Sequence, residues 1–187
     1  ALDISNSMLA EDVAPSRLER SKRLVEDLLN HFTNDKIGLV VFAGDAFVQL
    51  PITADYISAK MFLDNISPSL IGSQGTDIAK AIELSQHSFT QNSKFGKAII
   101  IITDGENHEG GAEEMARKAQ KAGIRVFILG IGSTAGAPIP MDDGSYLQDK
   151  NGQTVMTKLN EDMCRKVAEA GKGMYIHVDN TAAAEQM

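Results

Sequence analysis

The order of apolar and polar positions along the chain predicts strands that alternate with helices. Residues 36–43, 97–103 and 124–131 are continuous apolar runs of strand length. Such runs are typical of strands that are covered on both faces, as in a parallel sheet. Residues 46–52 form another short strand directly after the first run, which indicates an antiparallel hairpin. A final strand is expected at 174–178.

Helical periodicity occupies most of the sequence between these strands. The segments concerned are 15–32, 55–65, 76–89, 112–122, 159–170 and a last one that begins at 181. In the first helix, the apolar positions predict an inward face made of Leu18, Val25, Leu28, Leu29 and Phe32. Arg17 belongs to the charged positions that we expect on its outward face. In the second helix, Ile57, Met61 and Phe62 are expected to point inward.

This alternation predicts the fold class. We expect an α/β fold with a doubly wound, mostly parallel central sheet, helices on both faces and one antiparallel edge strand. Residues 132–157 fit none of these elements, because they are rich in turn residues, and Asn151-Gly152 is a hairpin signal. In sheets of this class, ligands bind beyond the carboxyl ends of the strands.

The ends of the sequence suggest that the domain is cut. Ala1, Leu2 and Asp3 resemble the last residues of a strand rather than a natural start. We therefore expect a single domain over 1–187 that lacks most of its first strand and part of its last helix. Residues that precede Ala1 in the parent protein would then fill the centre of the sheet. No apolar stretch is long enough to span a membrane, and no signal peptide is visible.

Composition narrows the class of ligand. Apolar residues make up 43% of the 187 residues, which is typical of a globular domain. The net charge of -7 argues against nucleic acid as the main ligand, since phosphate binding needs a positive surface. Cys164 is the only cysteine, so the chain can form neither an internal disulfide nor a cysteine-based zinc site.

Three short polar segments stand where predicted strands end or helices begin. Asp3, Ser5 and Ser7 alternate with other residues, Thr76 opens a helix, and Asp104 follows the most apolar strand. Side chains two positions apart in an extended segment point to the same side. The fold can therefore bring all five side chains to one edge of the sheet.

These five side chains offer only oxygen atoms. Oxygen ligands suit hard cations, so we expect Mg²⁺ at this site, with Mn²⁺ or Ca²⁺ as alternatives. Because the hydroxyls of Ser5, Ser7 and Thr76 are neutral, a cation bound mainly by them keeps much of its positive charge. Such a cation would attract a carboxylate from another molecule.

The motif Asp3-x-Ser5-x-Ser7, with Thr76 and Thr103-Asp104-Gly105, resembles the metal-ion-dependent adhesion site of von Willebrand factor type A (VWA) and integrin-type domains. The resemblance implies that Ser5, Ser7 and Thr76 ligate the metal directly. It implies that Asp3 and Asp104 act largely through water, and that an acidic side chain of a protein partner completes the coordination. The family commonly has glycine where this chain has Asn6.

Further segments resemble the VWA domains of bacterial aerotolerance-type (Bat) proteins, both BatA-like and BatB-like. They are Pro15-Ser16-Arg17-Leu18-Glu19, residues 103–110 and residues 136–140. The resemblance implies a parent protein anchored in the inner membrane by flanking helices, with this domain in the periplasm. It also implies partners among other Bat-type proteins or a MoxR-type AAA+ ATPase system.

The same residues also allow a function of a different class. A Mg²⁺-dependent phosphotransfer enzyme could use Asp3 as its nucleophile, but the haloacid-dehalogenase-like version needs an acid where Ser5 stands. We therefore expect a binding module and not an enzyme. Glu106, Asn107 and Glu109 could set partner selectivity at the rim, or form a plain solvated loop. His108 is more simply a solvent-exposed loop residue than a functional one.

Overall fold

The computed structural model describes residues 1–90, 95–107 and 109–178. Its main sheet has six strands in the order β3-β2-β1-β4-β5-β8. The bounds are β1 Leu2–Asp3, β2 Ile37–Phe42, β3 Ala46–Thr53, β4 Lys97–Thr103, β5 Ile124–Ile131 and β8 Lys172–Val178. Every neighbouring pair is parallel except β2 and β3, so the predicted fold class is confirmed, with β3 as the antiparallel edge strand.

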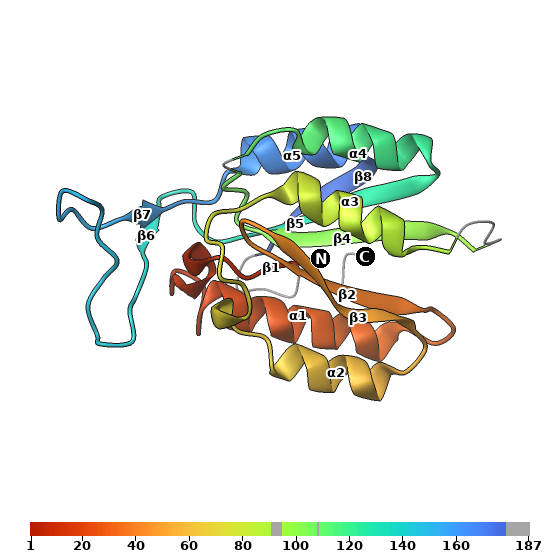
Figure 1. Cartoon of the computed structure of the whole chain (residues 1–187), viewed down its shortest axis with the longest axis horizontal. Coiled ribbons are helices and arrows are strands. Elements are labelled where there is room, and N and C mark those ends of the chain that lie inside the picture. The colour runs from red at the N-terminus through yellow and green to blue at the C-terminus, as the bar shows by residue number, and fades with distance from the viewer. Residues whose placement is uncertain (91–94, 108, 179–187) are drawn as a thin grey trace.

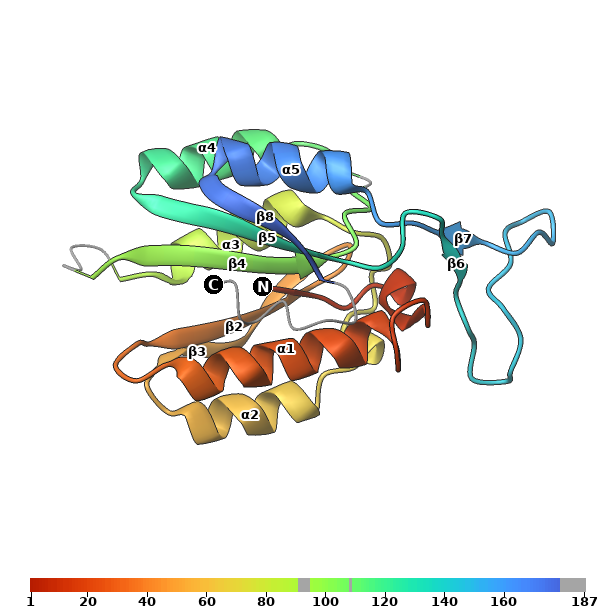
Figure 2. The same cartoon turned by 180° about the vertical axis from the view of Figure 1, so that it is seen from behind.

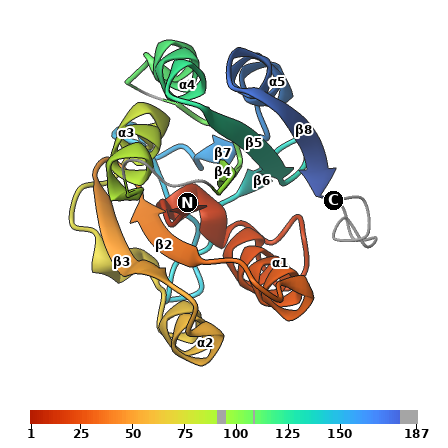
Figure 3. The same cartoon turned by 90° about the vertical axis from the view of Figure 1, so that its right-hand side faces the viewer.

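Helices cover both faces of this sheet (Figures 1 and 3). The α-helices are α1 Arg17–His31, α2 Tyr56–Asp64, α3 Ile78–Ser88, α4 Ala112–Lys121 and α5 Glu161–Ala170. Two short 3₁₀ helices are η1 Asn6–Leu9 and η2 Pro68–Leu70. One hydrophobic cluster joins α1 and α2 to the sheet, and a second joins α3, α4 and α5 to its other face.

Strand β4 shows why a continuous apolar run was needed. Ile99 and Ile101 belong to the cluster under α3, α4 and α5, whereas Ile102 belongs to the cluster under α1 and α2. Successive strand residues point to opposite faces, so a strand covered on both sides has to be apolar at nearly every position. The predicted central placement of this strand is therefore confirmed.

The predicted inward face of α2 is wrong. Ile57 is 76% exposed and Met61 is 63% exposed, and Phe62 is also exposed. The buried residues of the helix are Ala59 and Leu63 instead. The helix is short and apolar on more than one side, so the pattern of apolar residues alone did not select the face that packs against the sheet.

Strand β1 is short, although it lies at the centre of the sheet. Leu2 pairs with Val41 of β2 and with Ile102 of β4, and Asp3 pairs with Phe42. Strand β1 pairs only with residues near the carboxyl ends of β2 and β4, so it does not pair with the first halves of these two strands. A largely apolar cavity of about 340 Å³ lies there, lined by residues of both strands and of α1.

Between β5 and α5 the chain makes an excursion, residues 133–158, that we call the arm. It extends away from the sheet beyond the carboxyl ends of the strands (Figures 1 and 2). Strands β6 Ala137–Pro138 and β7 Met156–Thr157 pair at its base. Asn151-Gly152 forms a tight turn in which Gly152 N donates to Asp149 O at 3.0 Å. The predicted hairpin signal at this position is therefore confirmed.

Among the described residues, no helix is both long and apolar enough to cross a membrane. The helix expected from 181 onward lies outside the described residues.

Candidate metal centre

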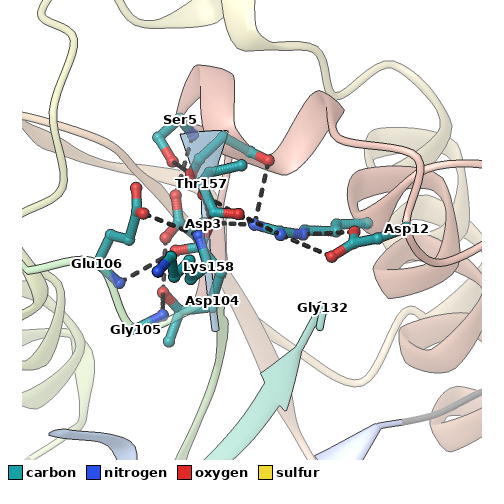
Figure 4. Close-up of polar contacts among 12 residues, drawn as sticks. Asp3, Ser5, Asp12, Asp104, Gly105, Glu106, Gly132, Thr157 and Lys158 are labelled. Atoms are coloured by element: carbon teal, nitrogen blue, oxygen red, sulfur yellow. Dashed lines mark hydrogen bonds and ion pairs between the residues drawn. The ribbon is translucent and has the colours of Figure 1, made fainter. Parts of the chain in front are cut away.

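The carboxyl edge of the sheet gathers the five predicted ligands from four segments. Asp3 ends β1, Ser5 and Ser7 lie in the turn that leads into η1 and in η1 itself, Asp104 follows β4, and Thr76 stands just before α3. All five are nearly or fully buried. Figure 4 shows Asp3, Ser5 and Asp104 close together at this edge.

Asp3 is held by both of its carboxylate oxygens. Its Oδ1 accepts a hydrogen bond from Ser5 N at 2.9 Å, and its Oδ2 accepts one from the hydroxyl of Thr103 at 2.6 Å. Gly105 N in turn donates to the Thr103 hydroxyl oxygen at 3.0 Å. Thr103 therefore orients Asp3 and links the ends of β1 and β4.

The two serines point toward each other, as their spacing predicts. Ser5 Oγ and Ser7 Oγ lie 3.0 Å apart and share a hydrogen bond. The turn is closed by Met8 N, which donates to Ser5 O at 3.0 Å. Two neutral oxygens at this separation can face a single cation together.

Asp104 is likewise held at both oxygens. Glu106 N donates to its Oδ1 at 3.1 Å, and the Arg17 guanidinium donates to its Oδ2 at 2.9 Å. The backbone oxygen of Asp104 accepts from Asn160 N at 2.8 Å, which ties this loop to the start of α5. With their own oxygens occupied in this way, Asp3 and Asp104 are suited to act on a cation through intervening water.

Thr76 reaches this edge through the loop before α3. Asp77 N donates to Ala43 O at 2.8 Å, so the loop is attached to the residue that follows β2. The Asn107 amide, in the orientation that satisfies both of its polar atoms, donates to Thr76 O at 3.2 Å. Thr76 is thus held in the loop next to β1, but no hydrogen bond of its hydroxyl joins it to the other four residues in the described part of the chain.

Burial dominates the electrostatics of the two carboxylates. Burial, together with the charge of Asp104, raises the pKa of Asp3 to about 7, against the hydrogen bonds from Thr103 and Ser5, which lower it. Burial also raises the pKa of Asp104, whereas the Ser7 hydroxyl and the Arg17 charge lower it. Two buried carboxylates that repel each other would be stabilised by a nearby cation.

The oxygen donors therefore fit a hard divalent cation. Asp3, Asp104 and the hydroxyls of Ser5 and Ser7 lie at one edge, with Thr76 in the loop before α3, and these side chains offer neither nitrogen nor sulfur. In the described residues, no three Asp, Glu, His or Cys side chains gather to hold a metal. A site in this chain would thus depend on hydroxyl ligands, and the assignment of the five residues as ligands stays a prediction.

Arg17 is the residue that the sequence analysis placed wrongly. It was expected on the outward face of α1, yet it is 0% exposed and contacts Asp104. A sequence signal was available, because a positive charge in the first turn of a helix opposes the helix dipole and needs another reason. Asp12 and Thr157, which also contact Arg17, were missed as well.

The residues predicted at the rim of the site differ in their contacts. Glu106 accepts a hydrogen bond from Lys158 N at 3.1 Å through its carboxylate, so it contacts the base of the arm. Asn107 supports the Thr76 loop, and Glu109 is exposed. His108 lies outside the described residues.

Comparison with known proteins gives consistent matches. The sequence profile of the von Willebrand factor type A domain matches residues 1–106. The crystal structure of the conserved hypothetical protein BatB from Bacteroides thetaiotaomicron is 58% identical, with a TM-score of 0.96, and the match covers 99% of this chain and 91% of that one. An aerotolerance-related membrane protein from Bacteroides fragilis is 56% identical, with a TM-score of 0.95 and coverages of 99% and 92%.

A curated relative from Borreliella burgdorferi, an uncharacterised protein, is 33% identical over 136 residues. The match covers 71% of this chain but only 40% of that relative. The chain likewise spans 54% and 29% of two further curated relatives. These matches therefore do not show that this chain has the activity of the longer proteins.

Proposed function

Because the chain belongs to the von Willebrand factor type A domain family and is a Bat-like, aerotolerance-type member of it, we propose that it binds a divalent cation and uses it to hold a protein partner. The cation would lie at the carboxyl edge of the sheet, among Asp3, Ser5, Ser7, Thr76 and Asp104. Mg²⁺ is the cation that we expect, because the donors are all hard oxygens.

The arrangement of polar groups at the carboxyl edge is the main support for this proposal. Both carboxylates already accept hydrogen bonds from the protein, and two hydroxyls face each other. Both oxygens of Asp3 and both of Asp104 accept hydrogen bonds from the protein. The hydroxyls of Ser5 and Ser7 contact each other. A cation bound directly by such neutral oxygens would keep most of its charge.

That residual charge suggests how the partner is recognised. A cation with an open coordination position attracts an oxyanion, and the carboxylate of Glu or Asp is the one that a protein partner can present. Asp3 and Asp104 would act on the cation through intervening water, so they would attract it without fully neutralising its charge. Binding of the partner should therefore require both the cation and an acidic side chain.

Calorimetry with Mg²⁺ and Mn²⁺ tests the site. We expect a dissociation constant on the order of 10⁻⁴–10⁻³ M, because low-charge oxygen sites bind weakly. The double substitution Ser5→Ala/Ser7→Ala should abolish binding. A matched control is Ser67→Ala/Ser69→Ala, since these hydroxyls have the same spacing and lie 2.7 Å apart, but on the exposed surface. Equal binding by both double variants would refute the assignment.

A pull-down from cells that express the full-length protein tests the partner. Wild type in Mg²⁺ should retain a protein that is lost in EDTA and in Ser5→Ala/Ser7→Ala. Asp104→Ala is a poorer choice, because it removes one of the carboxylates that neutralise the buried Arg17 and so threatens the fold. Undiminished capture in EDTA would indicate an interface that does not use the cation.

The alternative function is Mg²⁺-dependent phosphotransfer with Asp3 as the nucleophile. A nucleophilic carboxylate needs a free oxygen to attack phosphorus. Both oxygens of Asp3 accept short hydrogen bonds, and the residue is fully buried, which favours the binding module. A phosphatase assay with Mg²⁺ that compares wild type with Asp3→Asn discriminates the two functions.

The location of the full-length protein is a further part of the proposal. A relative with 56% identity is described as an aerotolerance-related membrane protein, which supports a membrane-anchored parent. We propose that this domain lies on the periplasmic side. Protease accessibility in intact spheroplasts tests the side. A MoxR-type ATPase would then act from the other side of the membrane, whereas other Bat-type proteins could contact this domain directly.

A further inference from the structure

The arm, residues 133–158, is attached to the candidate metal centre at both of its ends. At its start, Ser133 N donates to Asp12 Oδ2 at 2.7 Å. At its end, the Thr157 hydroxyl lies 3.4 Å from Asp104 Oδ2, to which it donates. Figure 4 shows Thr157 and Lys158 at this base, together with Asp12 and Asp104.

Arg17 connects these attachments. Its Nε and Nη2 donate to the two carboxylate oxygens of Asp12 at 2.8 and 2.7 Å. Its Nη1 donates to Asp104 Oδ2 at 2.9 Å and to the Thr157 hydroxyl at 3.0 Å, and its Nη2 donates to Thr157 O at 3.3 Å. The planar fork of an arginine matches this bidentate arrangement, which a lysine could not reproduce.

The Arg17 guanidinium fits against the backbone of residue 132 only because that residue is a glycine. A Cβ on Gly132, the residue before the arm, would lie 2.5 Å from Arg17 Nε, and its φ of +114° is one that other residues rarely adopt. The guanidinium is therefore packed directly against the point where the arm leaves β5. Its position and that of the arm depend on each other.

The charges of this buried group suggest what a cation would do to it. Asp12 and Asp104 share a single positive partner, Arg17, and the charge of Asp3 acts on Asp104, so the ionised cluster is negative. A divalent cation nearby would offset part of this negative charge. It would also compete with Arg17 and with the Thr157 hydroxyl for the same carboxylate, Asp104, because each of the three stabilises its negative charge.

We propose that Arg17 is a positioning residue through which cation binding at the edge loosens the arm. This inference rests on the proposed function, since it assumes that a cation binds near Asp104. As the cation takes up the charge of Asp104, the contacts of Asp104 with Arg17 and Thr157 weaken, and the base of the arm is released. The partner would then meet a different arm conformation when the cation is present.

Thermodynamic linkage makes this coupling measurable in two ways: as an effect of the cation on the arm, and as an effect of the attachment of the arm on cation affinity. If the cation weakens the attachment of the arm, then a mutation that weakens the attachment should strengthen cation binding, by a factor no larger than the coupling itself. Thr157→Val removes the hydroxyl that contacts Asp104 and Arg17 and leaves a side chain of similar shape. Thr157→Ser keeps the hydroxyl, and Thr154→Val changes an exposed threonine of the arm outside this network.

Two measurements on the same proteins test the proposal: Mg²⁺ affinity by calorimetry, and hydrogen exchange of the arm with and without Mg²⁺. We expect Thr157→Val to bind Mg²⁺ roughly fivefold more tightly, at the low end of typical coupling factors. In wild type, Mg²⁺ should accelerate exchange of the hydrogen-bonded amides of Leu147, Asp149 and Val155. In Thr157→Val this response should be much smaller, whereas Thr157→Ser and Thr154→Val should behave as wild type.

The possible failures are distinguishable. Binding of Mg²⁺ by wild type with an unchanged arm, or weaker binding by Thr157→Val, would overturn the coupling and leave the cation site standing. No binding of Mg²⁺ by wild type would overturn both the site and the coupling. A loss of structure in Thr157→Val would not mimic the expected result, because an unfolded protein cannot bind the cation more tightly.

Discussion

The two ends of the central strands differ sharply in how they are filled. At the carboxyl end, β1 lies between β2 and β4, and the polar groups of Asp3, Thr103 and Asp104 are all engaged. At the other end, residues of β2 and β4 line a largely apolar cavity of about 340 Å³ next to Ala1. The first region holds the candidate site, and the second is lined mainly by apolar residues.

Because the two regions lie at opposite ends of the strands, we expect that the candidate site and the stability of the sheet can be changed separately. The polar edge depends on the precise placement of a few hydrogen bonds. The cavity depends on backbone pairing and apolar contacts, which many sequences can supply. The following predictions use one region as the control for the other.

The largest effect is expected from filling the cavity. An extension of about ten apolar, β-branched residues before Ala1, one strand plus a margin, should pair with β2 and β4. Each recovered hydrogen bond contributes about 1 kcal/mol and each buried aliphatic side chain about 1.5–3 kcal/mol before ordering costs. We expect a net gain of about 5 kcal/mol, which corresponds to roughly 10–20 °C in a thermal melt.

A Gly/Ser extension of equal length is the control, because it offers backbone groups but no apolar side chains. Identical melting temperatures for the two monomeric extended proteins would show that the cavity does not accept a strand.

The next largest effect concerns the buried ion pairs of the polar edge. Arg17→Met keeps much of the side-chain length but leaves Asp12 and Asp104 without their shared positive partner. Removing one member of a buried ion pair costs about 3–5 kcal/mol. Urea denaturation should show this loss. Arg23→Met, a change at an exposed position of the same helix, should have a much smaller effect, and equal effects would contradict the special role of Arg17.

A smaller effect is expected from the cation itself. With a dissociation constant near 1 mM, 10 mM Mg²⁺ should stabilise the fold by about 1.4 kcal/mol, or roughly 3–5 °C. The shift should vanish in Ser5→Ala/Ser7→Ala. It should be the same with and without the apolar extension, because the cavity lies at the opposite end of the strands. A shift that depends on the extension would show that the two regions are linked.

An effect of a different kind is expected from pH. In the cation-free protein the pKa of Asp3 is raised from 3.8 to about 7, mainly by burial. The folded protein therefore binds this proton more tightly than the unfolded one. The contribution is fully present below pH 3.8 and is lost as the pH rises to about 7. Stability of wild type relative to Asp3→Asn should fall over this range, and a parallel course of the two curves would contradict the raised pKa.

The sequence alone determined the fold class and the position of most elements. Apolar runs such as 97–103 have few alternatives, because a run this short and this rich in isoleucine fits a strand covered on both faces better than a buried helix. It also placed Asp3 and Asp104 at strand ends, and parallel strands bring their ends to one edge. The convergence of Ser5 and Ser7 followed from their spacing.

Only the tertiary structure decided which polar groups share the buried space. Arg17 and Thr157 are 140 positions apart, and no local periodicity links an arginine of α1 to a threonine of the arm. In the same way, the apolar residues of α2 did not reveal that Leu63 faces the sheet while Ile57 faces solvent. Local patterns report how a segment can fold, whereas the choice among partners depends on contacts that form only when distant segments pack together.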